Sequence, residues 1–373
     1  MLTMCGGVTS HAAVMMRSMG KSGVVGAQNL TVDWDLCTLT STDNPELVVR
    51  TGDTITVDGS QGIVYMGEMP TVSTGTDSNF LTVMHWADKY KRMSVLANAD
   101  TLTQISTAGR LGAEGIGSCR TERMFAHPDC LTHFRRMILS DTTHDRATSL
   151  LEMLPKQQEK FLEMFRLVGD HPIVIRLLDP PLHEFLPSPR SSHFDKEMRE
   201  MAAKIDIPYE VCLRRVMELQ QSNPMLGFRG CRLSILYPEI TEMLTRAIVG
   251  AAVELKRRNF TILPKIVLPF ASTEQEVDRV ASLVSAASDS VCAKSWMDAS
   301  NSVQLLESKV AVLIETPRAC YRADAISRTR HVTDIIVSSD RLTDLVFGMN
   351  QIDSLDFLVS HVLLPYYALL VGV

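Results

Sequence analysis

One histidine near the start of the chain stands in a setting that suits phosphoryl chemistry. The stretch from Gly6 to Gly26 reads GGVTSHAAVMMRSMGKSGVVG, with two hydroxyl residues directly before His11. The run AAVMMRSMG predicts a helix that ends at a glycine and is capped by Ser10 or Thr9, with His11 in or near its first turn. Backbone N–H groups at that helix end would hold a dianion on the imidazole, which is a competent nucleophile at neutral pH. A surface histidine beside a helix cap is the alternative interpretation.

Most of the chain alternates between short apolar runs and amphipathic helical stretches. Repeated strand and helix predict a parallel sheet, and about seven such units predict a (β/α) barrel. The expected strands are VLANAD (95–100), AEGIGSC (113–119), IVIRLLD (173–179), KIVLPF (265–270), VAVLIET (310–316), DIIVSS (334–339) and a weaker candidate, GCRLSI (230–235). The helical stretches between them include 155–168, 239–258 and 273–288. No eighth strand is identified before the chain stops at Val373.

The first part of the chain differs in composition and pattern, and it predicts a smaller, β-rich domain. Residues 1–70 are glycine-rich, and DTITVDGSQGIVYM (53–66) predicts two strands around an Asp-Gly turn. The small polar residues 71–79 predict a linker, and residues 80–373 form the expected barrel domain.

Composition argues against several classes of function. The chain has 373 residues and a formal charge of -6, which gives no electrostatic footprint for nucleic acid or an anionic membrane. No apolar run is long enough to span a bilayer, and the first 30 residues lack the pattern of a secretory signal. The cysteines are scattered singly without a CxxC pair, which predicts reduced thiols and argues against a zinc site.

The histidine stretch resembles the phosphohistidine motif of the phosphoenolpyruvate (PEP)-utilising enzymes. The match continues through VDGSQGIVYMGEMPTV, NADT, GAEGIGSCRTERMF, IRLLDPPLHEFLP, NPMLGFRGCRL, VLPF and IETPRA. The full LLDPPLHEFLP and the TSHAAV form favour pyruvate phosphate dikinases over PEP synthase and enzyme I of the sugar phosphotransferase system. The resemblance implies an α/β fold with a partial swivelling phosphohistidine domain, followed by an incomplete (β/α)8 TIM-type barrel.

The resemblance also implies roles for residues of the first domain. By position in the motif, His11 is the phosphorylated histidine that carries phosphate between a nucleotide site and the barrel. Thr9 matches a threonine that some plant members phosphorylate for regulation, and Arg17 matches an arginine that helps to hold the phosphoryl group.

In the barrel, the resemblance places Arg120, Arg176 and Arg229 around the phosphate and carboxylate of PEP or pyruvate. Three guanidinium groups suit a small trianion because each can bond two oxygens. Glu315 matches a ligand of Mg²⁺, the implied cofactor. Glu315 and Arg176 both lie at or beyond the carboxyl end of an expected strand, where barrel active sites are found.

Several positions depart from the family pattern. The Gly-Thr-Asn-Asp segment after the seventh strand appears here as Ser-Ser-Asp-Arg, so Arg341 replaces the second magnesium carboxylate. Asp340 lies one residue earlier, and a ligand shifted by one residue usually points elsewhere, so Asp340 is a doubtful metal ligand. The histidine of Arg-Thr-Glu-His is Arg123 here, and the Cys-Gly-Glu motif that protonates the enolate is absent.

Two functions of different class follow from these observations. The first is a dikinase-type phosphotransferase, interconverting ATP, phosphate and pyruvate with AMP, diphosphate and PEP. Because the sequence reads as an internal portion without the nucleotide-binding domain, at most the half-reaction with PEP is expected. The second is an inactive dikinase remnant that acts as an interaction or regulatory partner of a full-length dikinase. Family members dimerise through the barrel, so a homodimer or such a heterodimer is expected, in the cytoplasm.

Overall fold

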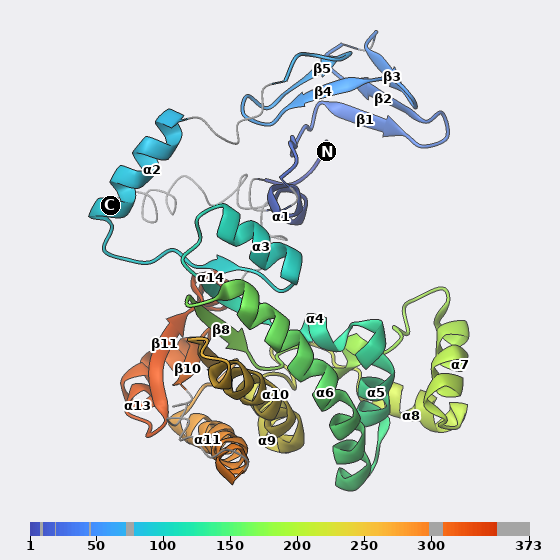
Figure 1. The fold of residues 1–373 in the computed structure, drawn as a ribbon. Helices are drawn as coiled ribbons and strands as arrows, with labels where there is room; N and C mark the ends of the chain where they lie inside the picture. The colour runs from blue at the N-terminus through green and yellow to red at the C-terminus, as the bar shows by residue number, and fades with distance from the viewer. Residues whose placement is uncertain (8–9, 19, 45, 72–77, 298–308, 349–373) are drawn as a thin grey trace. The chain divides into compact units, whose positions relative to one another are not determined.

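The computed structural model describes residues 1–7, 10–18, 20–44, 46–71, 78–297 and 309–348. They form two compact units, which we call unit 1, up to Met93, and unit 2, from Ser94 onward (Figure 1). Part of the expected linker, residues 72–77, lies outside the described residues. The region beyond residue 348, in which the sequence identifies no eighth strand, also lies outside the described residues.

Unit 1 contains short antiparallel strands and two helices, α1 (His11–Ser18) and α2 (Ser78–Tyr90). The hairpin expected at residues 53–66 is confirmed, and Asp58 Oδ1 accepts the backbone N–H groups of Ser60 and Gln61 in its turn. One sheet joins three strands and a second sheet joins two. The strands are β1 (Leu30–Asp33), β2 (Thr38–Ser41), β3 (Val48–Arg50), β4 (Ile55–Asp58) and β5 (Ile63–Met66).

Unit 2 contains a six-stranded parallel sheet with the order β11-β10-β9-β8-β7-β6. The strands are neighbours in space in the same order as along the chain. A TIM-type barrel requires this order, whereas a doubly wound sheet reverses it. The six stronger strand predictions are therefore confirmed as a parallel sheet in a mixed α/β fold. The strands are β6 (Ala97–Asn98), β7 (Ile116–Arg120), β8 (Pro172–Arg176), β9 (Leu263–Leu268), β10 (Lys309–Ile314) and β11 (Val332–Val337).

Long helices pack beside this sheet. Helix α10 (Pro238–Arg257) packs against both α6 (Thr143–Val168) and α11 (Glu274–Met297), as Figure 1 shows. These helices confirm the three helical stretches expected from the sequence. None of the described helices is both long and apolar enough to cross a bilayer. The remaining helices are α3 (Leu102–Arg110), α4 (Glu122–Phe125), α5 (Pro128–Leu139), α7 (Phe194–Ile205), α8 (Tyr209–Glu218), α9 (Cys231–Leu236), α12 (Pro317–Tyr321), α13 (Ala323–Ser327), α14 (Ser339–Phe347) and the 3-10 helix η1 (Leu182–Phe185).

The seventh strand prediction, GCRLSI, is wrong, because these residues form the short helix α9. Gly230 has φ of 54°, which turns the chain at the point where the strand was expected. The N–H of Gly230 donates to Asp179 O at 2.9 Å, and the N–H of Cys231 donates to Pro269 O at 2.8 Å. Both acceptors lie in loops, so these N–H groups do not pair with a neighbouring strand. Short apolar runs fit a buried helix as well as a strand, so periodicity alone could not decide.

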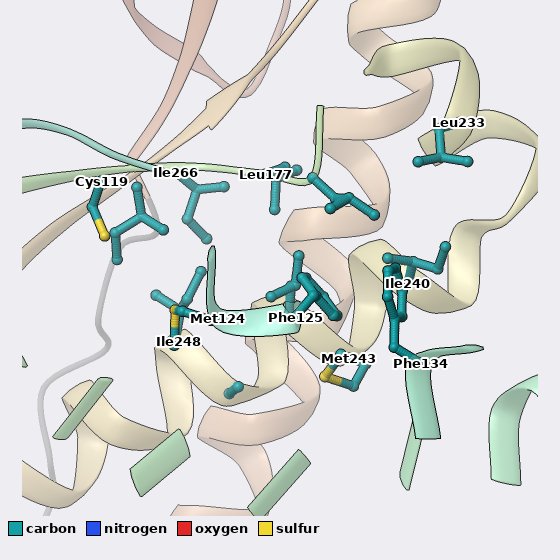
Figure 2. Close-up of a cluster of buried hydrophobic side chains, with 14 of the residues drawn as sticks. Cys119, Met124, Phe125, Phe134, Leu177, Leu233, Ile240, Met243, Ile248 and Ile266 are labelled. Atoms are coloured by element: carbon teal, nitrogen blue, oxygen red, sulfur yellow. The ribbon is translucent and has the colours of Figure 1, made fainter. Parts of the chain in front are cut away.

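The main core of unit 2 lies between the sheet and its helices. Cys119 of β7 and Ile266 of β9 share one buried cluster with Met243 and Ile248 of α10 (Figure 2). Burial raises the pKa of the Cys119 thiol to about 12, and the charges of nearby carboxylates add to the effect. Cys119 therefore acts as an inert packing group.

The other face of the sheet carries a smaller apolar cluster, formed by Val174, Val267 and Ala311. Each of these residues lies between two strand residues that belong to the main core. Because successive side chains of a strand point to opposite faces, the smaller cluster faces away from the helices. In a TIM-type barrel this face is the interior.

Candidate functional site

Three of the expected site residues leave the sheet on the face of the smaller cluster. Arg176 ends β8 and follows Ile175, a residue of the main core, so alternation turns its side chain to the opposite face. Arg120 ends β7 and pairs in register with Arg176. Glu315 follows Ile314, a core residue at the end of β10. The structure thus brings Arg120, Arg176 and Glu315 to one face, at the carboxyl ends of their strands.

A buried carboxylate, Asp179, joins two of the expected arginines. Asp179 is 1% exposed and Arg229 is 5% exposed. Arg229 Nε donates to Asp179 Oδ1 at 3.1 Å, and Arg229 Nη2 donates to Oδ2, so the pair is bidentate. Arg176 Nη1 lies 3.1 Å from the same Oδ2. One carboxylate therefore fixes the guanidinium groups of Arg176 and Arg229 side by side.

Arg176 has a second carboxylate partner in Glu122, which begins α4 directly after β7. Burial alone would lower the pKa of Arg176, but the charges of Asp179 and Glu122 outweigh it and raise that pKa above its usual value. Arg176 Nε and Glu122 Oε2 are buried without a hydrogen-bond partner among the described residues. Buried polar groups are normally paired, so these two atoms are exceptions within the cluster.

The turn at Gly230 and the loop after β9 hold Arg229 in place. Gly230 N–H donates to the backbone oxygen of Asp179 at 2.9 Å, which ties the Arg229 segment to the loop after β8. The guanidinium carbon of Arg229 lies 5.2 Å from the ring centre of Phe270, within reach of a cation–π interaction. Arg229 is therefore positioned by a carboxylate on one side and an aromatic ring on another.

Glu315 lies buried beside this cluster, at 2% exposure. Its Oε1 accepts the backbone N–H of Phe270 at 2.8 Å. Burial raises the pKa of Glu315 above its usual value, and the nearby charge of Asp179 adds to the rise. The Phe270 N–H and the charges of Arg176 and Arg229 oppose the rise without cancelling it.

Arg120 differs from the other two arginines because it is exposed. No carboxylate lies within 4.0 Å of its guanidinium group in the part of the chain that the structure describes. Its backbone N–H donates to Asp100 Oδ1 at 2.7 Å, and Arg123 Nε lies 3.2 Å from Asp100 Oδ2. Arg123, at the position of the family histidine, therefore pairs with Asp100, while the Arg120 side chain remains available to an anion.

Asp340, the doubtful metal ligand, lies in the first turn of α14. Ser338 N–H donates to Ile314 O at 3.0 Å, which places the start of α14 beside the strand end that carries Glu315. Asp340 Oδ1 accepts the Ser338 hydroxyl at 2.6 Å. Burial would raise the pKa of Asp340, but this hydrogen bond, backbone N–H groups and the charge of Arg341 bring the pKa below its usual value.

Arg341 reaches toward the arginine cluster. Its Nη1 lies 3.2 Å from the sulfur of Met225, and Arg229 Nη1 lies 3.9 Å from the same sulfur. Two guanidinium groups, one from α14 and one from the loop before α9, thus share a single thioether neighbour.

These positions do not fit the Mg²⁺ site implied by the resemblance. Proteins commonly hold Mg²⁺ with one or two carboxylates and oxygen atoms of the substrate. Of the two carboxylates in question, Glu315 accepts the backbone N–H of Phe270 through its Oε1. Asp340 already accepts the Ser338 hydroxyl, and the cation Arg341 lies beside Arg229. The donor set at this edge suits an anion better than a divalent cation.

In unit 1 the structure describes the histidine motif except for residues 8, 9 and 19. Helix α1 begins at His11, and Ser10 Oγ accepts the N–H of Ala13 at 3.4 Å, so Ser10 provides the predicted cap. Thr9 lies outside the described residues, as do the side chains of His11 and Arg17.

The sequence reasoning missed four residues that shape the site. Glu122 and Asp179 lie inside the quoted CRTE and IRLLD motifs, two and three residues after an arginine, so a search for counter-charges would have found them. Met225 and Phe270 carry no charge and contribute through a thioether and a ring. Their roles depend on how distant segments meet, which no local pattern reveals.

Comparison with known proteins identifies the class to which the chain belongs. Residues 76–367 match the PEP-binding domain of PEP-utilising enzymes, and residues 1–62 match the mobile domain of the same enzymes. The chain therefore belongs to the PEP-utilising enzymes, a family of phosphoryl-transferring enzymes.

Its relatives include pyruvate, phosphate dikinases, as the motifs predicted. The dikinase of Rhizobium meliloti (strain 1021) is 38% identical over 361 residues, which cover 96% of this chain and 38% of the relative. That of Giardia intestinalis is 38% identical over 97% of this chain and 39% of the relative. That of Clostridium symbiosum is 36% identical over 96% of this chain and 39% of the relative. The chain thus spans about two fifths of the length of these relatives.

Proposed function

We propose that the chain carries the PEP half-reaction of a pyruvate phosphate dikinase. Unit 2 would bind PEP or pyruvate, and His11 of unit 1 would accept or return the phosphoryl group. Unit 1 would then be a swivelling phosphohistidine domain, and unit 2 part of a (β/α)8 barrel. The observation that carries the proposal is the pair of guanidinium groups that the buried Asp179 holds at the carboxyl ends of the strands.

The arrangement suits the charges of PEP. Arg176 and Arg229 cannot move away easily because Asp179 fixes both, so their remaining N–H groups are positioned before a ligand arrives. Arg120 adds an exposed guanidinium from the neighbouring strand. Guanidinium groups bond phosphate and carboxylate oxygens in pairs, which suits a ligand that carries both groups.

The proposed transfer breaks the bond between phosphorus and the enol oxygen of PEP and forms a bond between phosphorus and an imidazole nitrogen of His11. The enolate of pyruvate is left and takes a proton from water to become pyruvate. Enzymes of this family generally use Mg²⁺, but the described donor set does not fit it. Neutralisation of the phosphate charge therefore falls to the arginines.

Labelling tests this proposal. The intact chain is incubated with PEP labelled on phosphorus, and we expect acid-labile label on the protein together with an equal amount of pyruvate. His11→Asn should reduce the label to background. The control His144→Asn changes an exposed histidine on α6 and should keep full labelling. Label that survives His11→Asn, or folded protein that takes up none, contradicts the proposal.

A second candidate function is favoured by Arg341, which stands where the family has a carboxylate. In that case the chain would be an inactive remnant that pairs with a full-length dikinase. Folded chain that takes up no label but co-elutes with such a dikinase in gel filtration would support this candidate. Association through unit 2, a cytoplasmic location and the domain limits 1–70, 71–79 and 80–373 stay predictions.

A further inference from the structure

We infer that unit 2 binds a small anion carrying phosphate and carboxylate groups without a divalent cation, with the Arg341 guanidinium in the charge-neutralising role. The identity of the ligand, PEP, rests on the proposed function. Metal independence rests on separate observations at the carboxyl edge of the sheet.

The first observation is the position of the Arg341 head group. Its Nη1 lies 3.2 Å from Met225 Sδ, and the buried Arg229 has its Nη1 3.9 Å from that sulfur. The two nitrogen atoms are thus no farther apart than the sum of these distances. A thioether is only a weak acceptor, so Met225 positions the two heads without neutralising either charge.

The second observation is the distribution of counter-charges. Asp179 pairs with Arg229, and Asp179 together with Glu122 pairs with Arg176. In the described ranges no carboxylate lies within 4.0 Å of the Arg341 guanidinium, although Arg341 is near enough for its charge to help lower the pKa of Asp340. A like charge repels a divalent cation that approaches this position, whereas a dianion is attracted to it.

The third observation concerns the carboxylates at the same edge. Glu315 accepts the backbone N–H of Phe270, and Asp340 accepts the hydroxyl of Ser338 at the start of α14. Both carboxylates thus serve to hold the loops after β9 and β11. The cations Arg120 and Arg341 therefore add to Arg176 and Arg229 as the groups that this edge presents to an anion.

Calorimetric titration of the intact chain with PEP tests the inference. Binding is measured at constant ionic strength, once in excess EDTA and once in excess Mg²⁺. The two dissociation constants should agree within about 2-fold. Arg341→Asp should weaken binding by about 10-fold or more in EDTA, as expected for the loss of a charge-assisted contact. Mg²⁺ should restore much of the affinity of this variant, because an aspartate can bind the ion.

A matched control separates this effect from net charge. Arg214→Asp makes the same change on an exposed arginine of α8 and should leave the dissociation constant unchanged in both solutions. The folded state of each variant is checked by its thermal unfolding. Arg341→Met removes the charge without creating a metal ligand, and it should weaken binding equally with and without Mg²⁺.

Three outcomes overturn the inference. They are PEP binding by the unaltered chain that disappears in EDTA, an Arg341→Asp variant that binds PEP normally in EDTA, and folded protein that binds no PEP in either solution. The first outcome combined with labelling of His11 would leave the proposed function standing. If PEP binds without a metal ion but His11 takes up no label, the inference stands and the proposed phosphoryl transfer is refuted.

Discussion

Replacing Asp179 by asparagine is expected to lower the free energy of unfolding of unit 2 by about 3–5 kcal/mol. The substitution keeps the size of the side chain and removes its charge. Arg229, at 5% exposure, then keeps a buried positive charge without its bidentate partner. Arg176 loses one of two carboxylates. A buried ion that loses its partner is costly because it has already given up its hydration.

Urea unfolding measures this loss, and Asp324→Asn provides the matched control. Asp324 pairs with Arg328 on the surface of α13, with both side chains exposed. Surface pairs of this kind contribute at most about 1 kcal/mol, so the control should unfold close to the unaltered protein. A loss below about 1 kcal/mol for Asp179→Asn would contradict the view that Asp179 holds the two arginines.

Replacing Gly230 by alanine is expected to destabilise unit 2 by roughly 2–4 kcal/mol and to weaken PEP binding. Gly230 has φ of 54° and ψ of -126°, a conformation that residues with a Cβ rarely adopt. A Cβ at this position would lie 2.6 Å from Phe270 Cβ and 2.8 Å from Pro269 O. Neither atom can yield easily, so the turn that positions Arg229 must shift.

Gly112→Ala separates backbone strain from the steric clash. Gly112 also has a positive φ, of 85°, but an added Cβ there meets no atom within 4 Å. This control should lose only about 1 kcal/mol and bind PEP normally. Equal losses of stability for the two variants would show that the contact with the loop after β9 does not restrain Gly230.

The repeating elements of unit 2 could be predicted from the sequence because their signals are local. Alternating apolar runs and amphipathic stretches predicted six strands that the structure confirms as one parallel sheet. The strand prediction for residues 230–235 was wrong for a physical reason. The turn at Gly230 and the hydrogen bonds from this segment to two loops favour a helix over a strand. Those bonds join segments that are far apart in the sequence.

The candidate site was predictable only in part. The motifs singled out Arg176 and Arg229, but the carboxylate that unites them lies 50 residues before Arg229. Met225 and Arg341 are 116 residues apart, and nothing in either local sequence indicates their contact. The sequence could therefore identify charged residues of the site individually, but it could not identify which of them pair. Their pairing followed from the packing of the loops after β8 and β9 and of α14.

The arginines at the carboxyl edge of unit 2 are expected to form a preorganised site for a small anion. A crystal structure of the chain soaked with PEP in the presence of EDTA would test this expectation. We expect PEP bound by Arg176 and Arg229, with Arg120 and Arg341 also in contact and no metal ion beside it. PEP bound elsewhere, or an empty arginine cluster at a saturating concentration of PEP, would contradict the claim.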